Sequence, residues 1–118
     1  AMRKITRLAA RAFLEGREFH RDNTSVTHYT PDIQDPLCVN VQLRLHGNLI
    51  AEWINMALPH SMNLRITLAG WPTATTRERL NGLLTEMGKR ERVWQHKHEQ
   101  YYGTHEDNRI ISSEWITV

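Results

Sequence analysis

A short segment that follows a predicted strand places hydroxyl and guanidinium groups at the start of a predicted helix over residues 76–87. The segment reads Gly70-Trp-Pro-Thr-Ala-Thr-Thr-Arg-Glu-Arg79. Free backbone N–H groups and the helix dipole favour anions at such an N-terminus, and guanidinium groups pair well with phosphate. Thr75, Thr76, Arg77 and Arg79 therefore predict a site for a small phosphorylated ligand.

The same residues also have a purely structural interpretation. Thr75 is a good N-cap, and Glu78 three residues later would complete a capping box. At ~100° per residue Arg77 and Arg79 lie about 200° apart on a helix, so they do not easily face one ligand. Both arginines would then be solvated.

A second group of cations lies at the start of the chain, in a predicted helix over residues 6–15. Thr6 is its predicted cap, Gly16 its predicted end, and Arg7 and Arg11 share one flank. Arg44 and Arg65 are expected on the polar face of the sheet and could extend this patch. Such a surface predicts salt-dependent contact with a nucleic-acid backbone, and a solvated helix flank is the alternative.

Other chemistry has weaker support in the sequence. His96 and His98 are predicted on one face of a strand over 93–102, with His105 nearby, but zinc needs three or four converging ligands. We expect no metal site and no cofactor, and the roles of these histidines stay open. Gly-x-Ser-x-Gly, Gly-rich phosphate-loop and His-Glu-x-x-His motifs are absent, so we expect a protein that is not an enzyme.

The elements that position these residues follow from hydrophobic periodicity. Alternation at Val39, Val41, Leu43 and Leu45 predicts a strand with one buried face. Gly47-Asn48 predicts a two-residue type II′ hairpin turn. Turn residues dominate 22–36 around a short extended piece, and further strands are predicted over 49–54, 64–68, 93–102 and 110–118.

Together these elements predict an α+β fold, in which an antiparallel sheet of about five or six strands has two helices packed on one face. The length of 118 residues predicts a single small domain over 1–118. No apolar run approaches the ~18 residues of a membrane helix. Cys38 is the only cysteine, which fits a reducing, cytoplasmic location.

Two motifs resemble those of small hypothetical proteins from bacteriophages and prophages. They are Leu45-His-Gly-Asn-Leu-Ile-Ala51 and Ala69-Gly-Trp-Pro-Thr-Ala-Thr-Thr-Arg-Glu-Arg-Leu-Asn81. The resemblance implies a phage or mobile-element origin and action inside a bacterial cell. It implies no activity and no assigned site.

Three hypotheses about function follow, with the oligomeric state left open. We favour an accessory protein that binds an anionic partner, nucleic acid, through Arg7, Arg11, Arg44, Arg65, Thr75, Thr76, Arg77 and Arg79. The first alternative is an inhibitor of a host defence or replication factor, anchored by Met56, Leu58 and Met62 of the predicted loop 55–63, because methionine-rich surfaces suit adaptable contacts. The second alternative is a binder of a small phosphorylated ligand at the N-terminus of helix 76–87.

Overall fold

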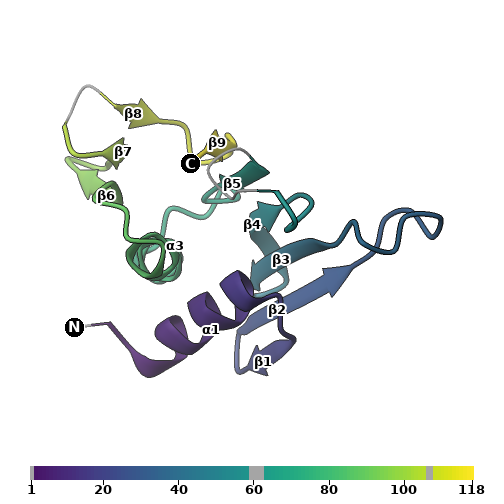
Figure 1. Ribbon diagram of the computed structural model, residues 1–118. Coiled ribbons are helices and arrows are strands. Elements are labelled where there is room, and N and C mark those ends of the chain that lie inside the picture. The colour runs from purple at the N-terminus through teal and green to yellow at the C-terminus, as the bar shows by residue number, and fades with distance from the viewer. Residues whose placement is uncertain (1, 59–62, 106–107) are drawn as a thin grey trace.

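The computed structural model describes residues 2–58, 63–105 and 108–118. Its larger sheet has six antiparallel strands in the order β1-β2-β3-β4-β5-β9 (Figure 1). Their bounds are Phe19–Arg21, Thr24–Tyr29, Asn40–Leu45, Asn48–Trp53, Leu64–Ile66 and Ile116–Thr117. A smaller antiparallel sheet joins β6 (Arg92–His96), β7 (Glu99–Gly103) and β8 (Arg109–Ile110). The predicted α+β class is confirmed.

Helices α1 (Lys4–Glu15) and α3 (Ala74–Glu86) pack against each other, and both contact the larger sheet. Figure 1 shows α1 along β2 and β3, with α3 between α1 and the smaller sheet. The core contains apolar side chains from both helices and from the sheet, among them Phe13, Leu43, Ile50, Leu80 and Leu84. None of the helices in the described ranges is long and apolar enough to cross a membrane.

Both helices begin earlier than the sequence predicts. α1 starts at Lys4, and Thr6 is a buried side chain inside the helix rather than its cap. In α3 the cap is Thr73, whose hydroxyl accepts a hydrogen bond from the Thr76 N–H at 3.2 Å. The predicted capping box of Thr75 and Glu78 is therefore wrong. Thr73 and Thr76 have the spacing of a cap and its N3 partner, so the helix starts before Thr75.

Two hairpin turns also differ from prediction. The β3–β4 turn is His46-Gly47, with φ of +52° and +81°, and Leu45 pairs with Asn48. Positive φ at both positions is the type I′ geometry. Because Leu45 pairs with Asn48, the two loop residues are His46 and Gly47, and the predicted II′ turn at Gly47-Asn48 is wrong. The predicted strand 93–102 is two strands, because Lys97 and His98 form a turn with φ of +50° and +68°.

The end of the chain divides between the two sheets. The predicted strand over 110–118 is the pair of short strands β8 and β9, which belong to different sheets. The turn of residues 111–114 between them is closed by a hydrogen bond from the Glu114 N–H to the Ile111 carbonyl at 3.1 Å. This turn lets the last segment complete the edge of the larger sheet.

The connection between β2 and β3 projects from the body of the molecule (Figure 1). We call residues 30–39 the arm. Its shape is set by two successive backbone hydrogen bonds, from Asp35 N–H to the Asp32 carbonyl at 3.0 Å and from Cys38 N–H to the Asp35 carbonyl at 3.1 Å. The Asp32 carboxylate also accepts from the Gln34 N–H at 2.9 Å. The arm is therefore a hydrogen-bonded structure.

The close crossing of α1 and α3 depends on a residue without a side chain. A Cβ atom added at Gly82 would lie 2.2 Å from Cγ2 of Thr6 and 3.5 Å from the Thr6 carbonyl oxygen. Thr6 cannot move freely, since its hydroxyl is hydrogen-bonded to two side chains of α3. Gly82 thus sets the distance between the helices.

We expect Gly82→Ala to lower the free energy of unfolding by about 1–3 kcal/mol, because the added methyl overpacks the crossing. At an exposed helix position a Gly→Ala change would stabilise the protein by roughly 1 kcal/mol. The sign of the measured change therefore shows whether the two helices cross closely at Gly82. Urea unfolding followed by circular dichroism measures it. Thr85→Ala, at an exposed site of the same helix, is the control and should stay within about 0.5 kcal/mol of wild type. A Gly82→Ala protein as stable as wild type would contradict the close crossing.

Candidate functional site

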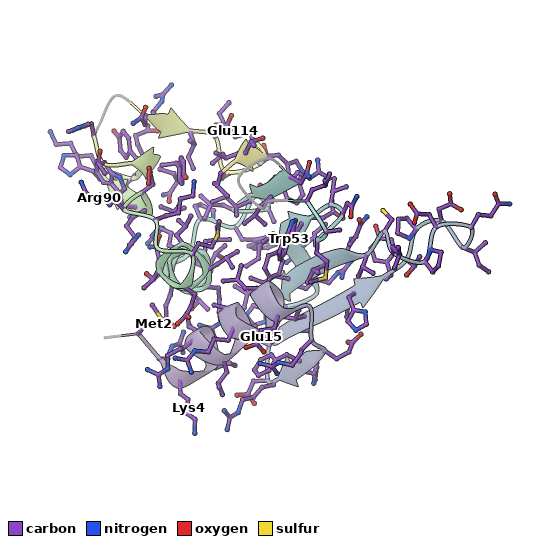
Figure 2. All side chains as sticks on the ribbon, viewed as in Figure 1. Met2, Lys4, Glu15, Trp53, Arg90 and Glu114 are labelled. Carbon is purple, nitrogen blue, oxygen red and sulfur yellow. The ribbon has the colours of Figure 1, made fainter. Side chains whose placement is uncertain are left out.

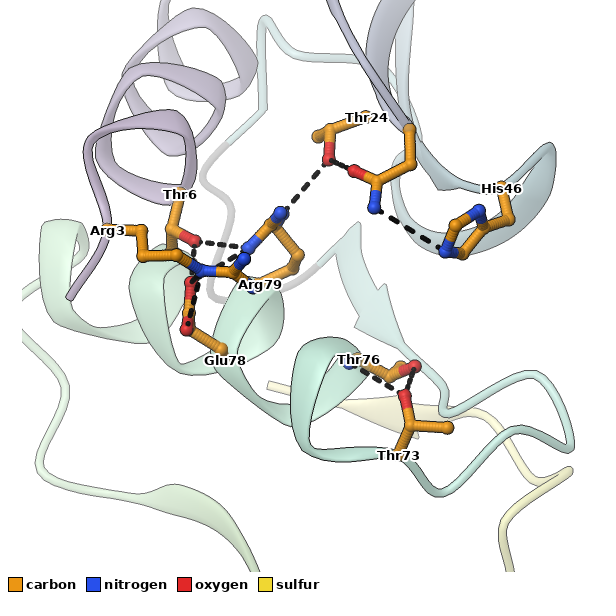
Figure 3. A network of polar contacts seen from close by, with 9 residues as sticks. Arg3, Thr6, Thr24, His46, Thr73, Thr76, Glu78 and Arg79 are labelled. Carbon is orange, nitrogen blue, oxygen red and sulfur yellow. Dashed lines mark hydrogen bonds and ion pairs between the residues drawn. The ribbon is translucent and has the colours of Figure 1, made fainter.

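Arg79, a predicted anion contact, lies inside the protein. Its side chain is 2% exposed, at the junction of α1, α3 and β2. Nε donates to Thr24 Oγ1 at 2.9 Å, and Nη1 donates to Thr6 Oγ1 at 2.6 Å and to Glu78 Oε1 at 2.8 Å (Figure 3). Arg79 therefore joins three elements and presents no donor to a ligand.

Glu78 balances this buried cation. Its carboxylate accepts from the Thr6 hydroxyl and from Arg3 Nε at 3.0 Å. Burial alone would raise the pKa of Glu78, but the hydrogen bonds from Thr6 and Arg3 and the charges of Arg3 and Arg79 outweigh it and lower the pKa. The two residues form a closed ionic network with Arg3.

Arg77 faces the smaller sheet rather than solvent. Its Nη1 donates to the Pro72 carbonyl at 2.9 Å, to Gln100 Oε1 at 3.1 Å and to Gln95 Oε1 at 3.2 Å. Burial lowers the pKa of this guanidinium from its ordinary value. Arg77 thus connects the start of α3 to the β6–β7 hairpin.

Arg44 and Arg65 lie on the outer face of the larger sheet, around a carboxylate. The side chain of Glu52 is 8% exposed and accepts from Gln42 Nε2 and from Arg65 Nη2, each at 2.7 Å. The Arg65 guanidinium stacks over Trp115, 4.3 Å from its ring centroid. Arg44 donates to Thr27 Oγ1 at 3.3 Å. The positive charge on this face is therefore partly neutralised.

The remaining predicted cations are on α1. Arg11 pairs with Glu86 of α3 at 3.6 Å. Arg7 is exposed, and within the described part of the chain no hydrogen bond or ion pair of its side chain is found. The six arginines thus do not gather into one positive surface among the described residues. Nucleic-acid binding stays a prediction, but it loses the feature on which it depended.

The predicted threonines border a cavity of about 510 Å³ between the β3–β4 hairpin and the start of α3. We call it the α3 cavity. Its apolar lining includes Leu45, Ile50, Leu68 and Trp71, and its polar lining consists of His46, Asn48, Thr73, Thr75 and Thr76. Thr76 is buried and hydrogen-bonded to Thr73, and Figure 3 shows this pair on a different segment from His46. No carboxylate is among these lining residues.

The predicted methionine-rich loop is only partly available. Met56 is half-buried and packs against the core, which corrects the prediction that it is an exposed anchor. Leu58 is 46% exposed, and its carbonyl accepts a hydrogen bond from Trp53 Nε1 at 3.3 Å. Met62 lies outside the described residues. Leu58 is therefore the one large apolar side chain that the described part of the loop exposes.

Among the described residues, the most exposed large aliphatic side chains are on the arm. The sequence analysis predicted turns over 22–36 and a strand that follows them. Ile33 is 92% exposed and Leu37 is 81% exposed. The arm contains Asp32 and Asp35 and no Lys or Arg. Figure 2 shows its side chains standing clear of the body. Ile33 lies among turn residues, and Leu37 continues the alternation of Val39 and Val41, so the sequence pattern did not indicate that either side chain is exposed.

The histidines do not form the expected pair. His96 ends β6, whereas His98 lies in the following turn, so they do not share one strand face. His105 is exposed. Across the ranges that the structure covers, no three His, Cys, Asp or Glu side chains are grouped so that they could hold a metal ion.

We expect Arg79→Met to lower the free energy of unfolding by about 1–3 kcal/mol, because it removes the donor to the buried Thr24 hydroxyl and one of the partners of Glu78. Arg79→Lys should be intermediate, since one ammonium does not reproduce the guanidinium fork. Arg7→Met removes the same charge from an exposed site and should change stability by less than about 0.5 kcal/mol. Urea unfolding compares the three variants. Equal stability of Arg79→Met and Arg7→Met would contradict a structural role for Arg79.

A pH dependence follows from Glu52. Burial alone would raise its pKa, but hydrogen bonds from Gln42 and Arg65 and the charges of Arg65 and Arg44 lower it below the ordinary value of 4.5. A depressed pKa stabilises the fold above pH 4.5, and this contribution is lost as pH falls through the folded-state pKa.

We therefore expect the stability of Glu52→Gln to fall less steeply than that of wild type as the pH drops below 4.5. Urea unfolding at a series of acidic pH values measures the two slopes. Asp35→Asn removes an exposed carboxylate for which no ion pair is found among the described residues, and it is expected to parallel wild type. Identical slopes for wild type and Glu52→Gln would show that the ion pair contributes nothing to acid sensitivity.

Comparison with known proteins bears on the origin of the chain. No curated protein and no solved structure matches it. The family model described as Kyanoviridae Gp96 protein matches residues 2–117, nearly the whole length. The match supports the phage origin that the resemblance implied. The chain therefore belongs to the Kyanoviridae Gp96 protein family, a family of phage proteins.

Proposed function

We propose that this phage protein is a non-enzymatic accessory protein that acts by binding another protein through its arm. The observation that carries the proposal is the exposure of Ile33 and Leu37, at 92% and 81%. Removing large aliphatic side chains from water is favourable, so a partner that covers them gains binding free energy. Grouped exposed apolar residues commonly mark interaction sites.

The charge of the arm favours a protein partner over nucleic acid. Asp32 and Asp35 are its only charged residues, and both would repel phosphate groups. Binders of single strands use aromatic platforms and cationic grooves, whereas Ile33 and Leu37 are aliphatic. The surface that complements the arm is an apolar pocket bordered by cations or by hydrogen-bond donors.

The order of the arm also supports binding. Its two turns and the hydrogen bond of Gln34 to Asp32 hold the backbone before any partner arrives. A segment that is already shaped loses less conformational entropy on association. Because the chain is phage-encoded, we propose a host protein, such as a defence or replication factor, as the class of partner.

The test compares immobilised wild type, the double variant Ile33→Ser/Leu37→Ser and the control Arg7→Ser in lysate of the host bacterium. Proteins that wild type retains are identified, purified and titrated against all three. We expect the arm variant to bind at least about tenfold more weakly, equivalent to 1.4 kcal/mol, and Arg7→Ser to bind like wild type. The lysate is treated with nuclease so that nucleic acid cannot bridge.

Two outcomes would count against the proposal. A partner that binds the arm variant as tightly as wild type would place the contact elsewhere. Labelled DNA and RNA are titrated at low and high salt in parallel. Salt-sensitive binding that Arg7→Ser weakens and the arm variant keeps would restore the nucleic-acid hypothesis.

A further inference from the structure

We propose that the arm of one copy of this protein enters the α3 cavity of a second copy, so that copies join head to tail. The inference rests on the proposed function, in which the arm is a protein-binding surface. It goes further by naming a second copy as one occupant of that surface and the α3 cavity as its receptor.

The arm and the cavity lie at opposite ends of β3. The arm ends at residue 39 and β3 begins at Asn40, whereas the first cavity residues, Leu45 and His46, come at the other end of the strand. Six strand residues at about 3.3 Å each span roughly 20 Å. The arm projects away from the strand that separates it from the cavity (Figure 1), so it cannot fill its own cavity.

The two surfaces have matching polarity. The arm offers two aliphatic side chains next to the carboxylates of Asp32 and Asp35. The cavity offers an apolar lining with Leu45, Ile50, Leu68 and Trp71, and its polar lining residues carry hydroxyl, amide and imidazole groups. No carboxylate among the lining residues would repel the two aspartates, while the Thr75 hydroxyl and the Asn48 amide can donate hydrogen bonds to them.

The volume of the α3 cavity is also compatible with the part of the arm between Ile33 and Leu37. A volume of about 510 Å³ lies in the range of about 300–1,000 Å³ that is typical of binding pockets. One aliphatic side chain would leave most of it empty. Ile33 and Leu37 together, with the turn between them, are a better match.

The geometry of such a contact has a consequence for assembly. Two different patches meet, so the interface is heterologous, and a joined pair keeps one free arm on one copy and one free cavity on the other. As the protein concentration rises, further copies add to the free ends. The assembly either closes into a ring or grows as an open filament. A two-fold dimer would not behave in this way.

The experiment uses two variants that each lose one half of the contact. Ile33→Ser/Leu37→Ser removes the apolar groups of the arm and keeps the cavity. Thr75→Glu puts a carboxylate on the cavity lining and keeps the arm, and an acidic residue in the first turn of a helix favours folding. Thr85→Glu is the matched control, because it makes the same change at an exposed position of the same helix outside the cavity.

Sedimentation velocity across a wide concentration range gives the assembly state. We expect wild type and Thr85→Glu to form assemblies larger than dimers as the concentration rises. The arm variant Ile33→Ser/Leu37→Ser and the cavity variant Thr75→Glu, here called the single-half variants, should each stay monomeric. An equimolar mixture of the two single-half variants should form a one-to-one complex and nothing larger, because only one functional arm and one functional cavity are present in each pair.

Three results would overturn the inference. They are a monomeric wild type at every concentration, single-half variants that assemble like wild type, and a mixture that forms no complex. Circular dichroism verifies that each variant is folded. If wild type is monomeric but a host protein binds wild type and not the arm variant, the proposed function stands and only the head-to-tail contact fails.

Discussion

The buried guanidinium of Arg79 is the interaction on which the arrangement of the helices depends. An isolated charge inside a protein is costly, so this one persists only because Glu78, Thr6 and Thr24 satisfy it. These partners come from α3, α1 and β2, and the bonds therefore fix where both helices lie on the sheet. Gly82 belongs to the same crossing, since its lack of a side chain lets Thr6 come close enough to complete the network.

Three of the arginines that the sequence analysis assigned to an anion site connect parts of the fold instead. Arg79 is buried, and Arg65 and Arg77 are half-buried. Arg77 and Asn81 hold the smaller sheet on α3, the latter through paired hydrogen bonds of 2.9 and 2.7 Å with the backbone of Val93. Arg65 connects the outer face of the larger sheet to Trp115. The proposed contact with another protein rests on the arm, where Ile33 and Leu37 are the most exposed of the large apolar side chains that the structure describes.

Much of the fold is encoded in local patterns, and much of the candidate site is not. The alternation along β3, the apolar positions Leu80, Leu83 and Leu84, and the glycine after α3 were all predictable. Arg79 was not, because an arginine on a helix is ordinarily solvated and its partners Thr24 and Thr6 lie 55 and 73 positions away in sequence. The Lys97-His98 turn lacks the asparagine or glycine that would have revealed it. The first part of the arm was predictable as turns, whereas Leu37 continues the alternation of the following strand. The exposure of Ile33 and Leu37 depends on the three-dimensional path of the chain.

The turns made by residues other than glycine have a consequence for how the chain folds. His46, Ala69, Lys97 and His98 all adopt positive φ, a conformation that L-residues with side chains rarely adopt. Such turns form poorly by themselves. Two of them are held by distant backbone, because the His46 N–H donates to the Asn23 carbonyl and the N–H of Gly70, next to Ala69, donates to the Ser112 carbonyl. We therefore expect these turns to be settled late on the folding pathway, after α1, α3 and the central strands have collapsed together, with a rate limited by long-range contacts.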